Sequence, residues 1–169
     1  KSQEKALKAQ KDNKFNDEII NFKIKSKKAE TNFNKDEHPR EGINLNALSR
    51  LKPVFKKDGS VTAGNASGIN DGAAAVTLMS KQEAEERGLE KLVTVKSWAS
   101  CGVDPALMGT GPIPSAKKAL DLAGWKINEV DLFEINEAFA AQSIAVVKTL
   151  SIPEEKVNVN GGAIALGHP

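Results

Sequence analysis

Cysteine is almost absent from this sequence, because the 169 residues contain only Cys101. A single thiol cannot form a disulfide within the chain, and it excludes a metal site built from several cysteines. Long apolar runs are also lacking, since the longest, such as AAAV and IAVV, are far too short to cross a bilayer. We therefore predict no metal site and no membrane partner, and the cysteine usage fits a reducing compartment.

The chain also lacks a strong excess of charge of one sign. Its formal net charge is +2 at pH 7, which does not suggest wrapping of nucleic acid around the protein. Lysines do gather within residues 1–28, but they are not interleaved with stacking aromatic side chains. We interpret this cluster as a solvated helix face and predict no nucleic-acid partner.

The first residues, KSQEKALKAQ, contain neither an initiator methionine nor the apolar core of a signal peptide. We therefore expect the chain to begin inside a longer protein. The absence of a targeting segment is then uninformative, so a cytoplasmic location is only the default expectation, and mitochondria and peroxisomes stay open as alternatives.

The first part of the chain predicts few regular elements. Residues 1–11 favour a helix by composition, and residues 19–25 alternate apolar and polar side chains as a strand does. Residues 25–42 show no apolar pattern and are predicted to form an exposed loop. Residues 43–51 predict a short helix that ends before Lys52, because helical geometry is disfavoured for a residue that precedes proline.

A glycine-rich stretch, residues 64–72, separates this part from a second part in which helices and strands alternate. A helix opened by Ser80 is expected to end at Gly88. The other predicted elements are strands at 73–79, 92–98, 130–135 and 156–160, and helices at 115–124 and 137–150. This alternation predicts an α/β fold, with a mixed and at least partly parallel sheet flanked by helices.

One predicted unit of this sheet brings Asn136 and His168 together. Asn136 follows the strand at 130–135, in the position expected for a helix N-cap, and the glycines that lead to His168 follow the strand at 156–160. Parallel strands end at the same edge of a sheet, where open α/β sheets usually bind ligands. Alone, Asn136 could be only a helix cap and His168 only a turn residue. Together, an amide and an imidazole suit stabilisation of an enolate or oxyanion in acyl transfer.

Four motifs carry a family resemblance. These are NEAFAAQ (136–142), NGGAIALGHP (160–169), GNASGINDGAAA (64–75) and MGTGPIP (108–114). They resemble the thiolases, most closely the biosynthetic type, and four long motifs in the right order make the match specific. The resemblance implies part of the layered α/β thiolase fold. Residues 1–68 would be the end of the loop domain and the return to the N-terminal half, and residues 69–169 the first part of the C-terminal domain.

The resemblance also implies an activity. Thiolases form or cleave 3-ketoacyl-CoA in two steps, with a cysteine carrying the acyl group, and the biosynthetic type condenses two acetyl-CoA molecules to acetoacetyl-CoA. Asn136 would hold a water that forms an oxyanion hole with His168, and His168 would help to activate the nucleophilic cysteine. Both catalytic cysteines of the family belong to segments outside this sequence, and Cys101 matches neither. We therefore expect an inactive fragment of an active enzyme.

Further residues match positions that bind coenzyme A in the family. Ser67 would contact the pantetheine arm and Arg40 the nucleotide. The remaining matches would line the CoA or acyl pocket, namely Phe55, Met108, Ala138 and Phe139. The implied partners are acetyl-CoA, acetoacetyl-CoA and CoA, which are substrates, so no cofactor is expected. The family also implies a homo-oligomer, either a dimer or a tetramer. His38, which lies in the polar loop, is expected to be exposed and inert.

Two alternatives stay open. One is a degradative 3-ketoacyl-CoA thiolase that acts on longer acyl chains. The other is a non-catalytic relative that binds CoA or lipid and has lost the chemistry. The intact NEAF and GHP motifs argue against this second alternative, because a binding protein needs no oxyanion hole.

Overall fold

The computed structural model describes residues 1–26 and 29–169. Its elements, in chain order, are α1 (Ser2–Lys11), β1 (Phe22–Lys25), β2 (Glu30–Phe33), α2 (Leu45–Ser49), α3 (Lys81–Glu86), the 3-10 helix η1 (Pro105–Thr110), α4 (Pro112–Ala123), η2 (Ile127–Glu129), α5 (Ala140–Leu150), η3 (Glu154–Lys156) and α6 (Ala163–Leu166). Within these described ranges, no helix combines the length and the apolar character needed to cross a membrane.

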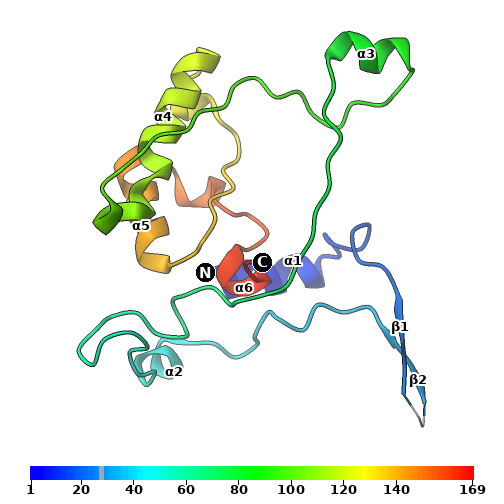
Figure 1. Cartoon of the computed structure of the whole chain (residues 1–169). Coiled ribbons are helices and arrows are strands. Elements are labelled where there is room, and N and C mark those ends of the chain that lie inside the picture. The colour runs from blue at the N-terminus through cyan, green and yellow to red at the C-terminus, as the bar shows by residue number, and fades with distance from the viewer. Residues whose placement is uncertain (27–28) are drawn as a thin grey trace.

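Helices α1 and α6 lie side by side at the centre of the molecule, although they come from opposite ends of the sequence (Figure 1). The predicted helix at residues 1–11 is confirmed as α1. Glu4 in its first turn and Lys8 and Lys11 in its last turn carry the charges that the helix dipole favours. Its Ala6 and Ala9 are buried, and their small side chains allow the close contact with α6.

The hydrophobic core lies around α5. Four buried residues form it, namely Val146, Leu150, Ile152 and Val157. Helix α4 packs against α5, and its Ile113 and Ala116 contact this core. The predicted helix at 115–124 is confirmed, but it begins earlier, at Pro112, because proline fits the first turn of a helix. Gly124 ends it in the left-handed conformation, with φ 70°.

The shorter predicted helices also form. Helix α2 lies within the predicted range 43–51, and Asn44 accepts a hydrogen bond from the Ala47 N–H at its start. Helix α3 begins after Ser80, whose side chain accepts from the Glu83 N–H at 3.1 Å. These side-chain oxygens pair amide groups that the first turn of a helix leaves without partners.

The predicted loop at 25–42 is wrong in its first part. Strand β2 lies there and pairs with β1 in an antiparallel hairpin, in which Phe22 is opposite Phe33. Lys27 and Lys28 of the predicted loop lie outside the described residues. Alternating Thr31 and Phe33 favour a strand, but both strands are exposed on both faces, so the apolar pattern was weak.

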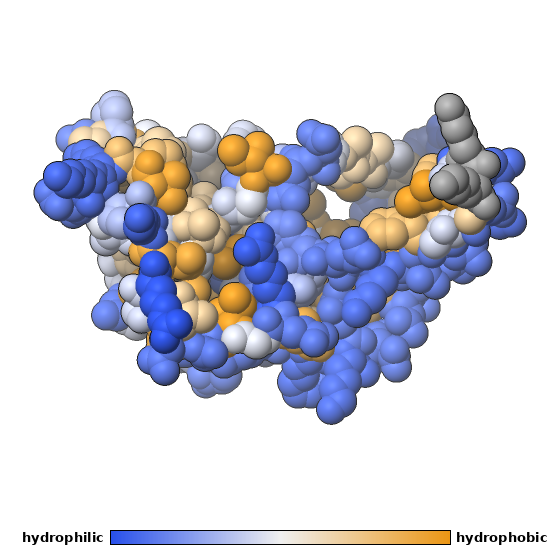
Figure 2. Space-filling model, turned by 90° about the horizontal axis from the view of Figure 1, so that it is seen from below, coloured by the Kyte–Doolittle hydropathy of each residue, from blue (hydrophilic) through white to orange (hydrophobic). Residues whose placement is uncertain are grey.

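The four strands predicted for the second part do not form as regular strands in the described residues. Segments 73–79 and 92–98 have no regular secondary structure, and their apolar side chains are open to solvent, for example Val76 at 84% and Leu92 at 92% exposure. Apolar side chains (orange) lie between hydrophilic ones on the face shown in Figure 2. A strand requires a hydrogen-bonded partner as well as an alternating sequence.

The predicted parallel pairing is confirmed at one place. Phe133 and Val157 form a parallel bridge between the segments predicted as the last two strands. The Phe133 N–H donates to the Lys156 carbonyl at 2.8 Å, and the Asn158 N–H donates to the Phe133 carbonyl at 2.8 Å. This short pairing holds the residues that lead to Asn136 beside those that lead to His168.

Gly161 is the close contact between this region and α1. Its φ is +97°, and a Cβ added there would lie 2.7 Å from the Ala6 Cβ. We expect Gly161→Ala to lower the free energy of unfolding by about 2 to 4 kcal/mol, because it combines backbone strain with a steric clash. Urea unfolding followed by circular dichroism measures this change.

The matched control is Gly88→Ala. Gly88 also has a positive φ, of +62°, but an added Cβ there would meet no atom within 4 Å. Gly88→Ala should lower the free energy of unfolding only through backbone strain, by about 1 to 2 kcal/mol. Equal losses in the two variants would show that α1 does not pack on Gly161 as described.

Candidate active site

Asn136 and His168 lie together, as the sequence predicted. The Asn136 Nδ2 is 3.4 Å from the His168 Nε2 and 3.5 Å from its Nδ1. The amide can donate to whichever ring nitrogen carries no proton, but these distances are at the long limit of a hydrogen bond. Asn136 and His168 are both partly exposed, so both groups are open to a ligand.

Asn136 is not the helix N-cap that we predicted. Helix α5 begins at Ala140, and its N-cap is Phe139. The chain ahead of this helix pairs with another segment, since Ala66 and Phe139 form an antiparallel bridge. The Asn136 side chain is therefore not used in capping and can face His168.

His168 is held by the stretch that contains the glycine-rich motif at 64–75. Its backbone N–H donates to the Asn70 Oδ1 at 3.1 Å. Asn70 fits closely against Gly167, where an added Cβ would lie 2.9 Å from the Asn70 amide. Gly167 has φ +101°, so the chain turns sharply there after α6. The turn and the amide contact together fix where the imidazole lies.

His38 is not exposed and inert as expected. It is half-buried, and its Nδ1 donates to the carbonyl of Ala165 in α6 at 2.6 Å. Its Nε2 faces Gly68, where an added Cβ would lie 2.8 Å away. His38 thus links the polar segment to α6, close to the turn that leads to His168.

Three of the predicted CoA-binding residues lie beside Ser67. The Ser67 N–H and Oγ both donate to the Ala138 carbonyl, at 3.0 and 3.1 Å. The ring of Phe139 meets that of Phe55 edge to face, with centroids 6.3 Å apart. Ala138 and Phe139 follow Asn136 closely in the chain, and Ser67 pairs with that stretch, so this group flanks the amide and the imidazole.

The structure does not join Met108 and Arg40 directly to this group in the part of the chain that it describes. Met108 is 73% exposed on η1, which packs against α5 beyond Phe139. Arg40 is exposed, and its backbone N–H donates to the Gln3 side chain at 2.7 Å. Within residues 1–26 and 29–169, no hydrogen bond or ion pair joins its guanidinium to Ser67 or Phe55.

Comparisons with known proteins identify the family of this chain. The family model of the thiolase N-terminal domain matches residues 1–82, and that of the thiolase C-terminal domain matches residues 89–169. The chain belongs to the thiolase family. The predicted division of this thiolase chain at residues 68 and 69 stays a prediction.

Individual relatives extend over the whole chain. An acetyl-CoA acetyltransferase of Shinella zoogloeoides is 56% identical over 99% of this chain. The crystal structure of the Bacillus anthracis acetyl-CoA acetyltransferase is 51% identical and superposes with a TM-score of 0.91, again over 99% of the chain. Human mitochondrial 3-ketoacyl-CoA thiolase in complex with CoA is 44% identical over 99% of the chain, with a TM-score of 0.90.

This thiolase chain spans less than half the length of these relatives. It covers 43% of the Shinella protein, 43% of the Bacillus structure and 41% of the human structure. The α/β thiolase fold is therefore confirmed for the part that this chain forms, with its helices and its small antiparallel sheet.

Two polar residues of the site escaped sequence analysis. Glu137 belongs to the NEAF motif, and its Oε2 accepts from the Ser2 Oγ at 2.6 Å and from the Ile164 N–H at 3.2 Å. Asn158 is buried beside Ile135, with 3% exposure. The carboxylate of Glu137, inside a motif, could have been recognised from the sequence. Asn158 could not, because an asparagine in a short apolar segment looks like an ordinary turn residue.

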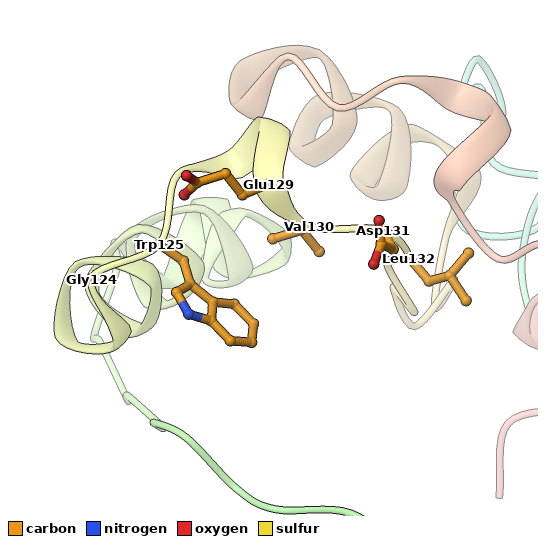
Figure 3. Close-up of a pocket in the computed structure, with 6 residues that line it drawn as sticks. All are labelled: Gly124, Trp125, Glu129, Val130, Asp131 and Leu132. Atoms are coloured by element: carbon orange, nitrogen blue, oxygen red, sulfur yellow. The ribbon is translucent and has the colours of Figure 1, made fainter.

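One surface hollow lies away from the predicted site residues in the described part of the thiolase chain. It is open, and it is lined by Gly124, Trp125, Glu129, Val130, Asp131 and Leu132, at the end of α4 (Figure 3). No predicted site residue lines it. Cys101 is partly buried and is not among these residues either.

Glu134 lies close to the site and has a shifted pKa. Partial burial raises the pKa of its carboxyl group above the ordinary value of 4.5, the nearby Glu137 carboxylate raises it further, and Lys5 opposes the shift. Because the folded state favours the protonated form, the stabilisation is complete below pH 4.5 and is lost as the pH rises through the folded-state pKa.

We expect Glu134→Gln to raise the melting temperature at pH values above the folded-state pKa of Glu134, and to have little effect at pH values below the ordinary value of 4.5. Melting curves between these pH values measure the difference. Glu90→Gln, on an exposed segment, is the control for the exchange of the side chain itself. An equal effect of Glu134→Gln at both pH values would contradict the assignment.

Proposed function

We propose that the protein containing this chain is an acetyl-CoA C-acetyltransferase. It condenses two acetyl-CoA molecules to acetoacetyl-CoA and catalyses the reverse thiolysis. The observation that carries the proposal is the pair of Asn136 and His168, whose side-chain nitrogens are 3.4 Å apart and open to a ligand. The Shinella and Bacillus relatives, both acetyl-CoA acetyltransferases, support the same reaction.

The chemistry follows from what these two groups can donate. In the condensation, the enolate of one acetyl-CoA attacks an acetyl group carried on a cysteine, a carbon–carbon bond forms, and the cysteine thiolate leaves. Negative charge develops on the thioester oxygen of the enolate, and fixed donors stabilise it without reorganising. Asn136, through a water, and His168 supply these donors.

The acyl-carrying cysteine is proposed to come from parts of the protein outside these 169 residues. The relatives are more than twice as long as this chain, which leaves room for such segments. Cys101 is the only cysteine in these 169 residues, it is a free thiol, and it matches neither catalytic cysteine motif of the family. We therefore propose that the 169 residues alone are inactive.

Coenzyme A would lie along the group around Ser67. The Ser67 hydroxyl would contact the pantetheine arm, Phe55 and Phe139 would pack on its apolar parts, and Arg40 would meet the nucleotide. Met108 and Ala138 would line the acyl end. The similarity to a human thiolase determined with CoA supports this proposal. CoA is a substrate here, and no cofactor is proposed.

The oligomeric state and the cellular compartment of the full protein are also proposals. We propose a homo-oligomer, a dimer or a tetramer, as the resemblance to the thiolases implies. A cytoplasmic location is supported by the cytosolic acetyl-CoA acetyltransferase of Rattus norvegicus, which is 55% identical. The human mitochondrial enzyme keeps mitochondria as an alternative.

The degradative 3-ketoacyl-CoA thiolase is the second candidate. It is supported by the human structure, whose TM-score of 0.91 equals that of the Bacillus enzyme. Thiolysis of substrates of increasing acyl length separates the two. The biosynthetic enzyme should favour the four-carbon substrate, and the degradative one should prefer longer chains.

The decisive test uses the full-length protein. We expect it to cleave acetoacetyl-CoA in the presence of CoA, and we expect Asn136→Ala and His168→Ala each to lower kcat by about 10²- to 10³-fold, the cost of losing an oxyanion donor. Cys101→Ser is the control and should keep its activity. A folded, oligomeric protein that neither cleaves acetoacetyl-CoA nor forms it would overturn the proposal in favour of a non-catalytic relative.

A further inference from the structure

Asn158 is the one buried polar side chain among the described residues, with 3% exposure. Burying an amide is costly unless its oxygen and its NH2 group both find partners. Both do: the Asn158 Oδ1 accepts from the Ile135 N–H at 2.7 Å, and the Asn158 Nδ2 donates to the Ile135 carbonyl at 2.8 Å. The Asn158 side chain therefore pairs with both backbone polar groups of Ile135, the residue directly before Asn136.

These two bonds replace a missing step of the parallel pairing. The backbone bonds of Phe133 to Lys156 and Asn158 would be followed, in a regular ladder, by bonds from Ile135 to residues 158 and 160. Asn158 instead has φ +44°, and its carbonyl accepts from the Gly161 N–H at 2.9 Å. The chain thus turns away, and the Asn158 amide takes the place of the peptide group that has left.

Asn158 consequently joins both arms of the site. Its side chain fixes the backbone at Ile135, directly before Asn136. Its carbonyl fixes the turn at Gly161, from which the chain runs through α6 to His168. The packing is close, since a Cβ added to Gly162 would lie 2.6 Å from the Asn158 Nδ2.

We infer that Asn158 is a positioning residue that sets the Asn136 amide against His168, and that its side chain acts on the reaction through Asn136. The inference rests on the proposed thiolase activity. Asn158 is buried, so it does not touch CoA, and its loss should change kcat rather than KM. A displacement of about 1 Å in a catalytic group can cost about 100-fold in rate.

Asn158→Asp is the sharpest variant, because it exchanges only the NH2 group for an oxygen and suits the left-handed backbone. The carboxylate that it introduces still accepts from the Ile135 N–H, but it cannot donate to the Ile135 carbonyl and repels it. In the full-length enzyme, we expect kcat for acetoacetyl-CoA thiolysis to fall about 10- to 100-fold at pH 8, with KM within about 3-fold. The loss should become smaller toward pH 5.5, as protonation of the introduced carboxylate restores a donor.

A double-mutant cycle separates positioning from a general effect on the fold. If Asn158 acts through Asn136, then Asn158→Asp should lower kcat by less than about 2-fold in an Asn136→Ala background. Equal losses in both backgrounds would overturn the inference. Asn13→Asp is the matched control, because Asn13 also has a positive φ, of 57°, and is exposed. It should leave kcat unchanged.

Hydrogen exchange keeps the test independent of the proposed function. The Ile135 amide should exchange slowly in the wild-type protein and about 10-fold faster or more in Asn158→Ser, whose short hydroxyl cannot bridge both Ile135 groups. This second variant also serves if Asn158→Asp does not fold. A wild-type protein without thiolase activity overturns the proposed function, and unchanged exchange at Ile135 overturns the inference.

Discussion

The structure depends on a junction at which Ser2, Glu137 and Gly162 meet. The Gly162 N–H donates to the Ser2 Oγ, and the Ser2 Oγ donates to the Glu137 carboxylate, which also accepts from the Ile164 N–H. Three segments far apart in the sequence are thereby held at the first turn of α6. No side chain fits at Gly162, because an added Cβ would collide with the Glu137 carboxyl group and with Asn158.

The two residues of the candidate site, Asn136 and His168, lie on chain segments that start from this junction. Asn136 directly precedes Glu137, and His168 directly follows the turn after α6. The contact of Ala6 with Gly161 supports the same place from the side of α1. Small buried residues and paired polar groups therefore position Asn136 and His168. The apolar core around Val146 is a separate cluster of buried residues.

The sequence predicted most helices and the meeting of Asn136 with His168, because both depend on local signals. Ser80 and Gly124 mark helix ends through their own chemistry, and the four motifs place the site residues in order. The strands at 73–79 and 92–98 failed, because a strand depends on partners that the alternation of side chains cannot identify. Asn158 and His38 were missed for a related reason: their roles depend on backbone groups distant in the sequence, Ile135 and Ala165.

The contact between α1 and α6 also has a consequence for the order of folding. Helices α4 and α5 and the turn after them are neighbours in sequence, and short loops close quickly, so they can form early. Residues 2–11 can dock only after residues 161–166 have been synthesised, and closing so long a loop costs conformational entropy. The docking of α1 on α6 is therefore expected among the last native contacts to form.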